Sequence, residues 1–183
     1  ADTLMKNSIK LLIACVLLAL LAGCANTKAV TSQDAYYKST EVVSNSKLSN
    51  NIQVEAEGFR ETSKNAFSEN RTSNINNSEA KKAIEESLKT AGLFSQEGSY
   101  VLKASLLDSD LAGFWGQKSE EREISINFLL EDSSNNVVYN KDIVGKGENE
   151  IGFISLQWKE EHIVATRAYR DAFRQLIEDL KDL

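Results

Sequence analysis

The sequence predicts an α+β fold, in which a small, mostly antiparallel sheet of order β-α-β-β-α carries two helices packed on one face. Three observations predict this class. Stretches that alternate apolar and polar residues indicate half-buried strands, and two apolar stripes of helical period indicate amphipathic helices. A turn-forming run at 131–136 between two such stretches indicates a hairpin. Together they predict a single α/β domain over residues 52–183 of a 183-residue chain.

Four alternating or apolar segments account for the expected sheet. The first strand is predicted at 52–59 and the second at 100–106. A hairpin then joins 123–130 to 137–144. Four apolar residues of its first arm are expected to face one side of the sheet: Ile124, Ile126, Phe128 and Leu130. The Asn/Ser-rich residues 60–77 are expected to form a long loop.

The first helix is predicted over residues 78–91. Ser78 is a suitable N-cap, and the apolar face consists of Ala80, Ile84, Leu88 and Ala91. Gly92 stands where a helix ends in a left-handed residue, and Leu93 is then placed to pack on Leu88 in a Schellman ending.

The last helix is predicted from residue 158 or 159 to near residue 183. Its apolar stripe consists of Val164, Ala165, Ala168, Tyr169, Ala172, Phe173, Leu176, Ile177, Leu180 and Leu183. On the solvent side, i,i+4 spacing predicts ion pairs between Arg167 and Asp171 and between Arg174 and Glu178.

The first 23 residues are predicted to be a signal peptide. Met5 is the expected natural start, with residues 1–4 an artefact, and a short basic stretch leads into the uninterrupted apolar run 11–22. A membrane-spanning helix needs about 20 apolar residues. The apolar core of a signal peptide needs only about 7–15, which this run satisfies.

The run ends in Leu21-Ala22-Gly23-Cys24, which resembles the lipobox of bacterial lipoproteins. The resemblance implies cleavage after Gly23 and lipidation and acylation of Cys24. Ala25 stands where Asp would retain a lipoprotein in the inner membrane. The resemblance therefore implies an outer-membrane lipoprotein whose domain faces the periplasm. An ordinary signal peptide followed by a chance cysteine is the alternative.

Cleavage changes the composition. The sequence has a formal net charge of −6, and removal of Asp2, Lys6 and Lys10 makes the mature chain −7. An acidic chain argues against a nucleic-acid partner, which selects a basic surface. Cys15 leaves with the signal peptide and Cys24 is acylated, so the mature chain is expected to have no free thiol.

Residues 24–51 are predicted to be the lipidated cysteine and a flexible tether. Residues 25–51 are rich in Ser, Thr, Asn and Lys, and such a composition does not bury enough apolar surface to offset the entropy lost on ordering. A tether of this length averages roughly 30 Å from end to end. The alternative is that Tyr36-Tyr37 or Val42-Val43 docks onto the domain.

Residues 78–183 resemble a group of Gram-negative envelope lipoproteins that has no settled biochemical role. The matching segments are 83–94, 100–104, 111–114, 136–140 and 165–170. The order of elements is also similar to that of periplasmic lipoproteins that assist outer-membrane assembly or secretion. These resemblances imply a binding or assembly accessory.

No residue pattern predicts catalysis, a cofactor or a metal site. His162 follows Glu161, but it is the only His in the chain and is expected to be exposed in the first turn of the last helix. Residues 145–152 fail the G-x-G-x-x-G phosphate pattern because residue 150 is Glu. A catalytic carboxylate pair stays open as an alternative. We therefore expect a protein that is not an enzyme.

Two apolar segments lie where polar loops are expected, at 111–116 and 151–158. Their aromatic residues are candidate interaction residues: Phe114, Trp115, Phe153 and Trp158. The alternative is that both segments fold back over the core.

The predicted function is a non-enzymatic binding or assembly accessory for another envelope protein. The second hypothesis is a periplasmic carrier or sensor of a small apolar or glycan ligand.

Overall fold

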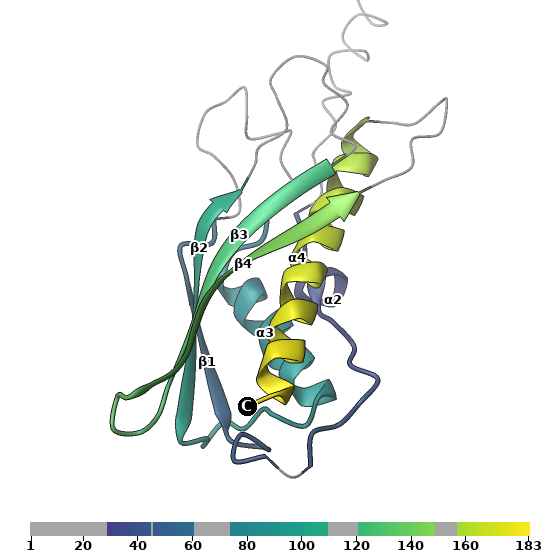
Figure 1. Ribbon diagram of the computed structural model, residues 1–183. Helices are drawn as coiled ribbons and strands as arrows, with labels where there is room; N and C mark the ends of the chain where they lie inside the picture. Colours follow the sequence, from purple (N-terminus) through teal and green to yellow (C-terminus); the bar gives the residue numbers. More distant parts are fainter. Residues whose placement is uncertain (1–28, 45, 61–73, 110–120, 149–156) are drawn as a thin grey trace, which may run out of the picture.

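The computed structural model describes residues 29–44, 46–60, 74–109, 121–148 and 157–183. One sheet carries helices on a single face (Figure 1). In chain order the elements are α2 (Ser32–Ala35), β1 (Ile52–Glu57), α3 (Asn77–Thr90), β2 (Tyr100–Ser109), β3 (Glu121–Glu131), β4 (Val137–Glu148) and α4 (Gln157–Lys181).

The sheet has the spatial order β1-β2-β3-β4. β1 runs parallel to β2, with Val54 opposite Leu102, and the other two pairs are antiparallel. The predicted α+β class and the mostly antiparallel sheet are confirmed. The order is β-α-β-β-β-α, which contains all four predicted strand segments, whereas the order β-α-β-β-α counts one strand too few.

The core lies between the sheet and the two long helices. The four predicted residues of β3 are fully buried, and so is the stripe of α4 from Val164 to Leu180. The Phe128 and Phe173 rings meet edge to face, with their centroids 6.5 Å apart. Leu183 is the exception, because α4 ends at Lys181 and leaves its side chain 45% exposed.

Strand β4 extends beyond the predicted 137–144 and includes Gly145 and Gly147. A Cβ atom on Gly145 would overlap the carbonyl oxygen of Ala168, and one on Gly147 would overlap that of Val164. The two glycines therefore let α4 lie directly on the backbone of β4.

Helix α3 begins and ends one residue before the predicted bounds of 78–91, and it ends with the predicted geometry. The Asn76 side chain accepts a hydrogen bond from the Glu79 N–H (2.8 Å), so Asn76 is the N-cap in place of Ser78. At the other end Gly92 has φ +71°, and the Leu93 N–H donates to the Leu88 carbonyl (2.8 Å). This is the predicted Schellman ending.

Residues 29–51 pack against the domain, which corrects the expectation of a flexible tether for this segment. Val30, Ala35 and Leu48 are buried, and α2 packs on both α3 and α4. Val43 is also packed partly against the core, whereas Val42 is 69% exposed. We call residues 29–51 the strap.

Polar groups of α3 bind the backbone of the strap. The Ser32 N–H donates to the Glu79 carboxylate (2.8 Å), and the Tyr37 N–H donates to the Ser87 hydroxyl (2.9 Å). Further along, the Asn50 N–H donates to the Gly92 carbonyl (2.9 Å). A polar segment becomes ordered here because α3 satisfies its backbone groups while a few isolated apolar side chains enter the core.

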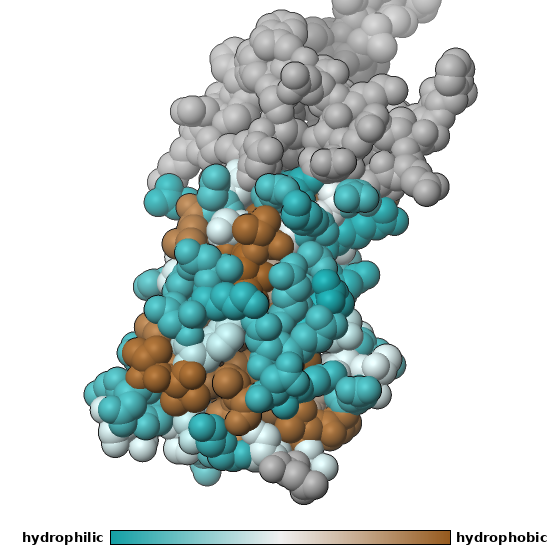
Figure 2. All heavy atoms as spheres, in the orientation of Figure 1, coloured by the Kyte–Doolittle hydropathy of each residue, from teal (hydrophilic) through white to brown (hydrophobic). Residues whose placement is uncertain are grey.

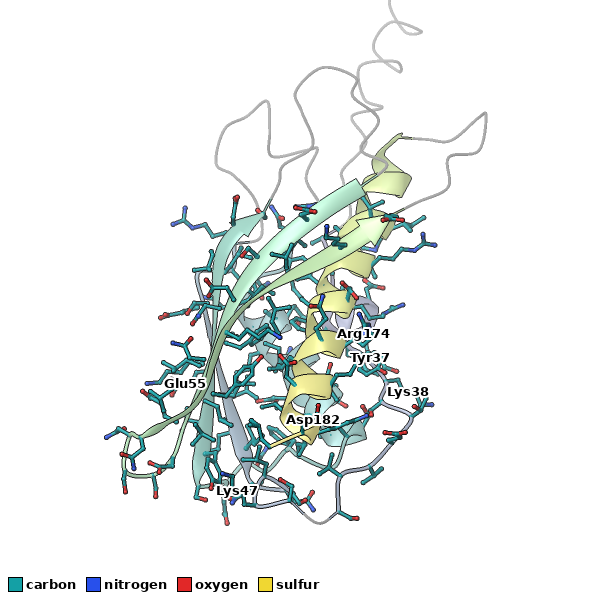
Figure 3. All side chains as sticks on the ribbon, viewed as in Figure 1. Tyr37, Lys38, Lys47, Glu55, Arg174 and Asp182 are labelled. Carbon is teal, nitrogen blue, oxygen red and sulfur yellow. The ribbon has the colours of Figure 1, made fainter. Side chains whose placement is uncertain are left out.

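The face of the sheet opposite the helices is polar. Figure 3 shows Glu55 on this outer face, with Arg174 and Tyr37 on the helix side. Figure 2 shows a largely hydrophilic surface in the same orientation, with hydrophobic residues in separate groups. The exposed large hydrophobic residues come from different elements, among them Leu107 in β2, Val137 in β4 and Ile163 in α4. Single exposed hydrophobic residues are ordinary on a protein surface.

Candidate functional site

The predicted site residues fall mostly outside the described residues. Cys24, Phe114, Trp115 and Phe153 all lie there. Trp158 belongs to the first turn of α4, but its side chain is not described. The ends of the elements that flank these residues are described, and they show where the segments join the domain.

Three segments join the sheet at one end. Ser109, the last residue of β2, is paired with Ile124 near the start of β3. Glu121 at the start of β3 is paired with Glu148 at the end of β4. Because β1 is parallel to β2, β1 also runs toward this end of the sheet and has Glu57 as its last residue. Segments 61–73, 110–120 and 149–156 therefore all connect to the same end of the sheet, which we call the loop end.

The first described residues lie at the loop end too. The Val30 N–H donates to the carbonyl of Asn74 (3.0 Å), and Val30 is only 1% exposed. The Arg167 guanidinium donates to the carbonyl of Glu148, which places the N-terminal half of α4 beside the end of β4. The chain thus enters the domain next to the ends of β2, β3 and β4.

A buried arginine connects the elements of the loop end. Arg122 is 2% exposed and its guanidinium donates to the side-chain oxygen of Asn74 (2.7 Å). Tyr169 is fully buried nearby, between Phe59 and Phe173, with ring centroids 6.4 and 6.3 Å away. Burying a charge stabilises a fold only where hydrogen bonds satisfy it. Arg122 therefore ties β3 to the residues that hold Val30.

Burial raises the pKa of Tyr169 to about 12, although the nearby Arg122 charge and the backbone of Ile75 both act to lower it. The phenol is therefore neutral at physiological pH. The buried ring of Tyr169 fills the core beneath the loop end.

His162 lies against α2, and the expectation of an exposed first-turn His is wrong. Its side chain is 17% exposed, with Nε2 3.6 Å from a carboxylate oxygen of Asp34. α4 begins at Gln157, so His162 belongs to its second turn, which α2 covers. Arg170 donates to the Asp34 carbonyl from the same helix. His162 thus helps to hold the strap on α4.

The pKa shifts at the other end of the molecule also accompany contacts between elements. The Tyr139 hydroxyl donates to Asp179 (2.6 Å), and Lys141 donates to the same carboxylate (2.7 Å). Burial and this hydrogen bond raise the pKa of Tyr139. Burial alone would raise the pKa of Asp179, but the hydrogen bonds from Lys141 and Tyr139 outweigh it and lower the pKa. These residues connect the C-terminal part of α4 to β4.

Within the described part of the chain, no group of three or more His, Cys, Asp or Glu residues is arranged to hold a metal ion. Among the same residues, no helix is both long and apolar enough to cross a bilayer.

The elements define an α+β domain whose four-stranded sheet is covered on one face by two long helices and a strap. No protein-family model matches the chain, and no curated protein sequence matches it. Solved structures with a similar fold include proteins of Gram-negative bacteria, a lipoprotein among them.

Three of these structures illustrate the degree of similarity. The minor lipoprotein from Acinetobacter baumannii is 10% identical, with 73% of this chain and 94% of that chain covered and a TM-score of 0.45. PelC from Paraburkholderia phytofirmans, a dodecamer, is 16% identical, with 73% and 94% covered and a TM-score of 0.41. Protein XCC0632 from Xanthomonas campestris is 14% identical, with 80% and 92% covered and a TM-score of 0.44.

Proposed function

We propose that the protein is a lipid-anchored lipoprotein of the outer membrane, whose periplasmic domain binds another envelope component and catalyses no reaction. The lipobox-like residues Leu21-Ala22-Gly23-Cys24 support the anchor. The acidic mature chain supports a partner that is not a nucleic acid. The domain acts by presenting a surface, and it needs no cofactor.

One observation carries this proposal: the strap begins at the loop end. Val30 is bound to Asn74 there, six residues after Cys24. The segments that contain Trp115 and Phe153 connect to the same end, because they join Ser109 to Glu121 and Glu148 to Gln157. The lipid anchor and the aromatic candidate residues therefore attach to the domain side by side.

Aromatic side chains suit such a surface. Tyr, Trp and Phe are enriched in the cores of protein interfaces, where each buries a large area at a low cost in conformational entropy. Phe114, Trp115, Phe153 and Trp158 stand within two segments that are apolar for their position between strands and helices. We propose that these four residues bind the partner.

The anchor is tested by replacing Cys24. Cys24→Ser is expected to remove the acyl groups from the chain. Cys15→Ser is the matched control, because Cys15 lies in the predicted signal peptide and leaves with it. Mass spectrometry of the mature N-terminus reads the modification directly. A parent protein whose mature N-terminus carries no acyl group would contradict the anchor.

The binding surface is tested by crosslinking in intact cells, followed by purification from detergent-solubilised envelopes. Trp115→Ala and Phe153→Ala are expected to remove the same crosslinked partner. Val137→Ala is the control, because Val137 is 59% exposed at the opposite end of β4. An identical set of partners for all three variants would exclude the two segments as the binding surface.

A further inference from the structure

We infer that the loop end of the domain faces the lipid bilayer directly and that the hairpin turn 132–136 points away from it. The inference rests on the lipidation of Cys24 proposed above. It concerns a different property, namely which described surface lies against the membrane and how closely.

The length of chain between the anchor and the domain sets the distance. Val30 is fixed by its hydrogen bond to Asn74 and is buried. Six residues lead from Cys24 to Val30. Fully extended, they reach about 20 Å, at 3.3–3.6 Å per residue. The loop end therefore stays within about 20 Å of the lipid, instead of moving freely on a long tether.

The domain is longer than this link. β4 has 12 residues and runs from the hairpin turn to the loop end. At about 3.3 Å per residue it is roughly 40 Å long. An orientation with the hairpin turn on the bilayer would need a link about twice as long as six residues allow. It is therefore excluded as long as the strap stays docked.

Several contacts keep the strap docked. Ser32 is bound to Glu79 on α3, and Asp34 contacts both Arg170 and His162 on α4. Leu48, near the end of the strap, has no exposed surface. Release of the strap would break hydrogen bonds to two helices and expose core side chains. The docked strap is therefore the stable state, and the link to Cys24 stays short.

An orientation in which the outer face of the sheet lies against the bilayer is also disfavoured. The outer face carries the acidic residues Glu55, Glu57, Glu123, Glu131 and Asp142. The lysines of this face are already paired, Lys103 with Glu131 (2.7 Å) and Lys146 with Glu123 (2.8 Å). Such a face is repelled by anionic lipids.

Helix α3 offers no better attraction to a bilayer. On α3, Lys81 is 3.9 Å from Glu85, Lys82 is 3.0 Å from Glu79 and Lys89 is 2.6 Å from Glu86. Each of these lysines is therefore balanced by a neighbouring glutamate, and the described residues of α3 offer no cluster of unpaired lysines to bind anionic headgroups. The loop end remains as the surface that the link brings to the lipid.

The orientation can be measured on protein-free vesicles. The lipidated protein is reconstituted into phosphatidylethanolamine/phosphatidylglycerol vesicles that contain a lipid with a spin-labelled headgroup. Glu148→Cys and Val137→Cys place a fluorophore at the two ends of β4, both at exposed positions. The mature chain has no other unmodified thiol if Cys24 is acylated. Quenching is expected to be several-fold stronger at position 148 than at position 137.

Equal or reversed quenching would overturn the inference. Flotation of the protein with the vesicles and the mass of its N-terminus are measured on the same samples. Protein without acyl groups that fails to float would contradict the proposed anchor, and this orientation with it. Asymmetric quenching in native membranes but not in vesicles would show that a membrane protein, and not the bilayer, orients the domain.

The role of the short link is tested separately. An insertion of about 20 Gly/Ser residues after Ala25 adds roughly 25 Å of average reach. It is expected to lower the ratio of quenching between positions 148 and 137. A ratio that the insertion leaves unchanged would show that the link does not set the orientation.

Discussion

The backbone N–H of Lys146 in β4 donates to the side chain of Asp171 in α4, across 3.0 Å. Two further residues of α4 make the same kind of contact. Arg167 donates to the carbonyl of Glu148, and Gln175 donates to the carbonyl of Val144 (3.0 Å). Side chains of one helix thus bind successive backbone groups along one edge of the sheet.

The spacing of these three residues along α4 matches the spacing of their partners along β4. Arg167, Asp171 and Gln175 are four residues apart, which is about 6 Å along an α-helix. Their partners in β4 are two residues apart, which is about 6.6 Å along a strand. An edge strand with unpaired backbone groups invites association with other strands. The polar row on α4 therefore both holds the helix and protects the edge of β4.

We predict that Asp171→Ala lowers the free energy of unfolding by about 1–3 kcal/mol, because the Lys146 N–H loses its charged acceptor. Asp171→Asn is expected to lose less, since an amide oxygen accepts the same hydrogen bond. Glu178→Ala is the control: its partner is Arg174 on the surface, and such pairs contribute at most about 1 kcal/mol. Urea denaturation measures all three. An Asp171→Ala protein as stable as Glu178→Ala would show that the edge contact contributes nothing.

Gly147→Ala is expected to destabilise the protein by about 3 kcal/mol or more, because added volume in a tight contact displaces the backbone. The new Cβ would overlap the carbonyl of Val164 and lie 2.8 Å from the Ala168 nitrogen. Neither atom belongs to a side chain that can rotate away. Val144→Thr, an exposed change in the same strand, is expected to stay within about 0.5 kcal/mol. Thermal unfolding compares the two, and equal stability would argue against direct packing of α4 on β4.

The elements whose apolar residues recur with a clear helical or strand period were predictable from the sequence. The stripe of α4 and the alternation in β3 each report which side of one element is buried, and each is independent of distant residues. The Schellman ending at Gly92 was predictable for the same reason, since it depends on three neighbouring residues.

Features that depend on distant partners were not predictable. The predicted strand stops at residue 144, before Gly145-Lys146-Gly147, and only the approach of α4 explains why glycine is needed within a strand. The strap reads as a tether because its order comes from Glu79, Ser87 and Gly92 of the α3 region. For the candidate site, only the types of residue were predictable from the sequence. That their segments connect to the same end of the sheet follows from the pairing of Ser109 with Ile124 and of Glu121 with Glu148.

Leu48→Ala tests whether the strap belongs to the folded domain. Leu48 is fully buried, and truncation of a buried leucine costs about 2–5 kcal/mol. We expect a loss in this range by urea denaturation. Val42→Ala is the control in the same segment, because Val42 is 69% exposed, and it is expected to change stability by less than about 0.5 kcal/mol. If both variants unfold like the parent, the strap contributes no core packing.

The contact between Ser32 and Glu79 gives the strap a dependence on pH. The hydrogen bond from the Ser32 backbone, together with bonds from the Lys82 and Ser32 side chains, lowers the pKa of Glu79 from 4.5 to about 2. A carboxylate whose pKa is lowered on folding stabilises the folded state at pH values above its pKa in the unfolded chain. That contribution is lost as the pH falls toward its pKa in the folded protein. Glu79 therefore contributes fully above about pH 4.5 and progressively less down to about pH 2.

We predict that Glu79→Gln is less stable than the parent at neutral pH and that this difference shrinks as the pH falls from about 4.5 to about 2. Urea denaturation across this range measures the difference, and amide exchange at Ser32 reports the contact itself. Glu86→Gln is the control, because Glu86 binds only Lys89 of the same helix and is 41% exposed. Other carboxylates titrate in the parent and in both variants, so their effects cancel in the comparison. A Glu79→Gln difference that stays constant through acid pH would show that the strap is held without the charge of Glu79.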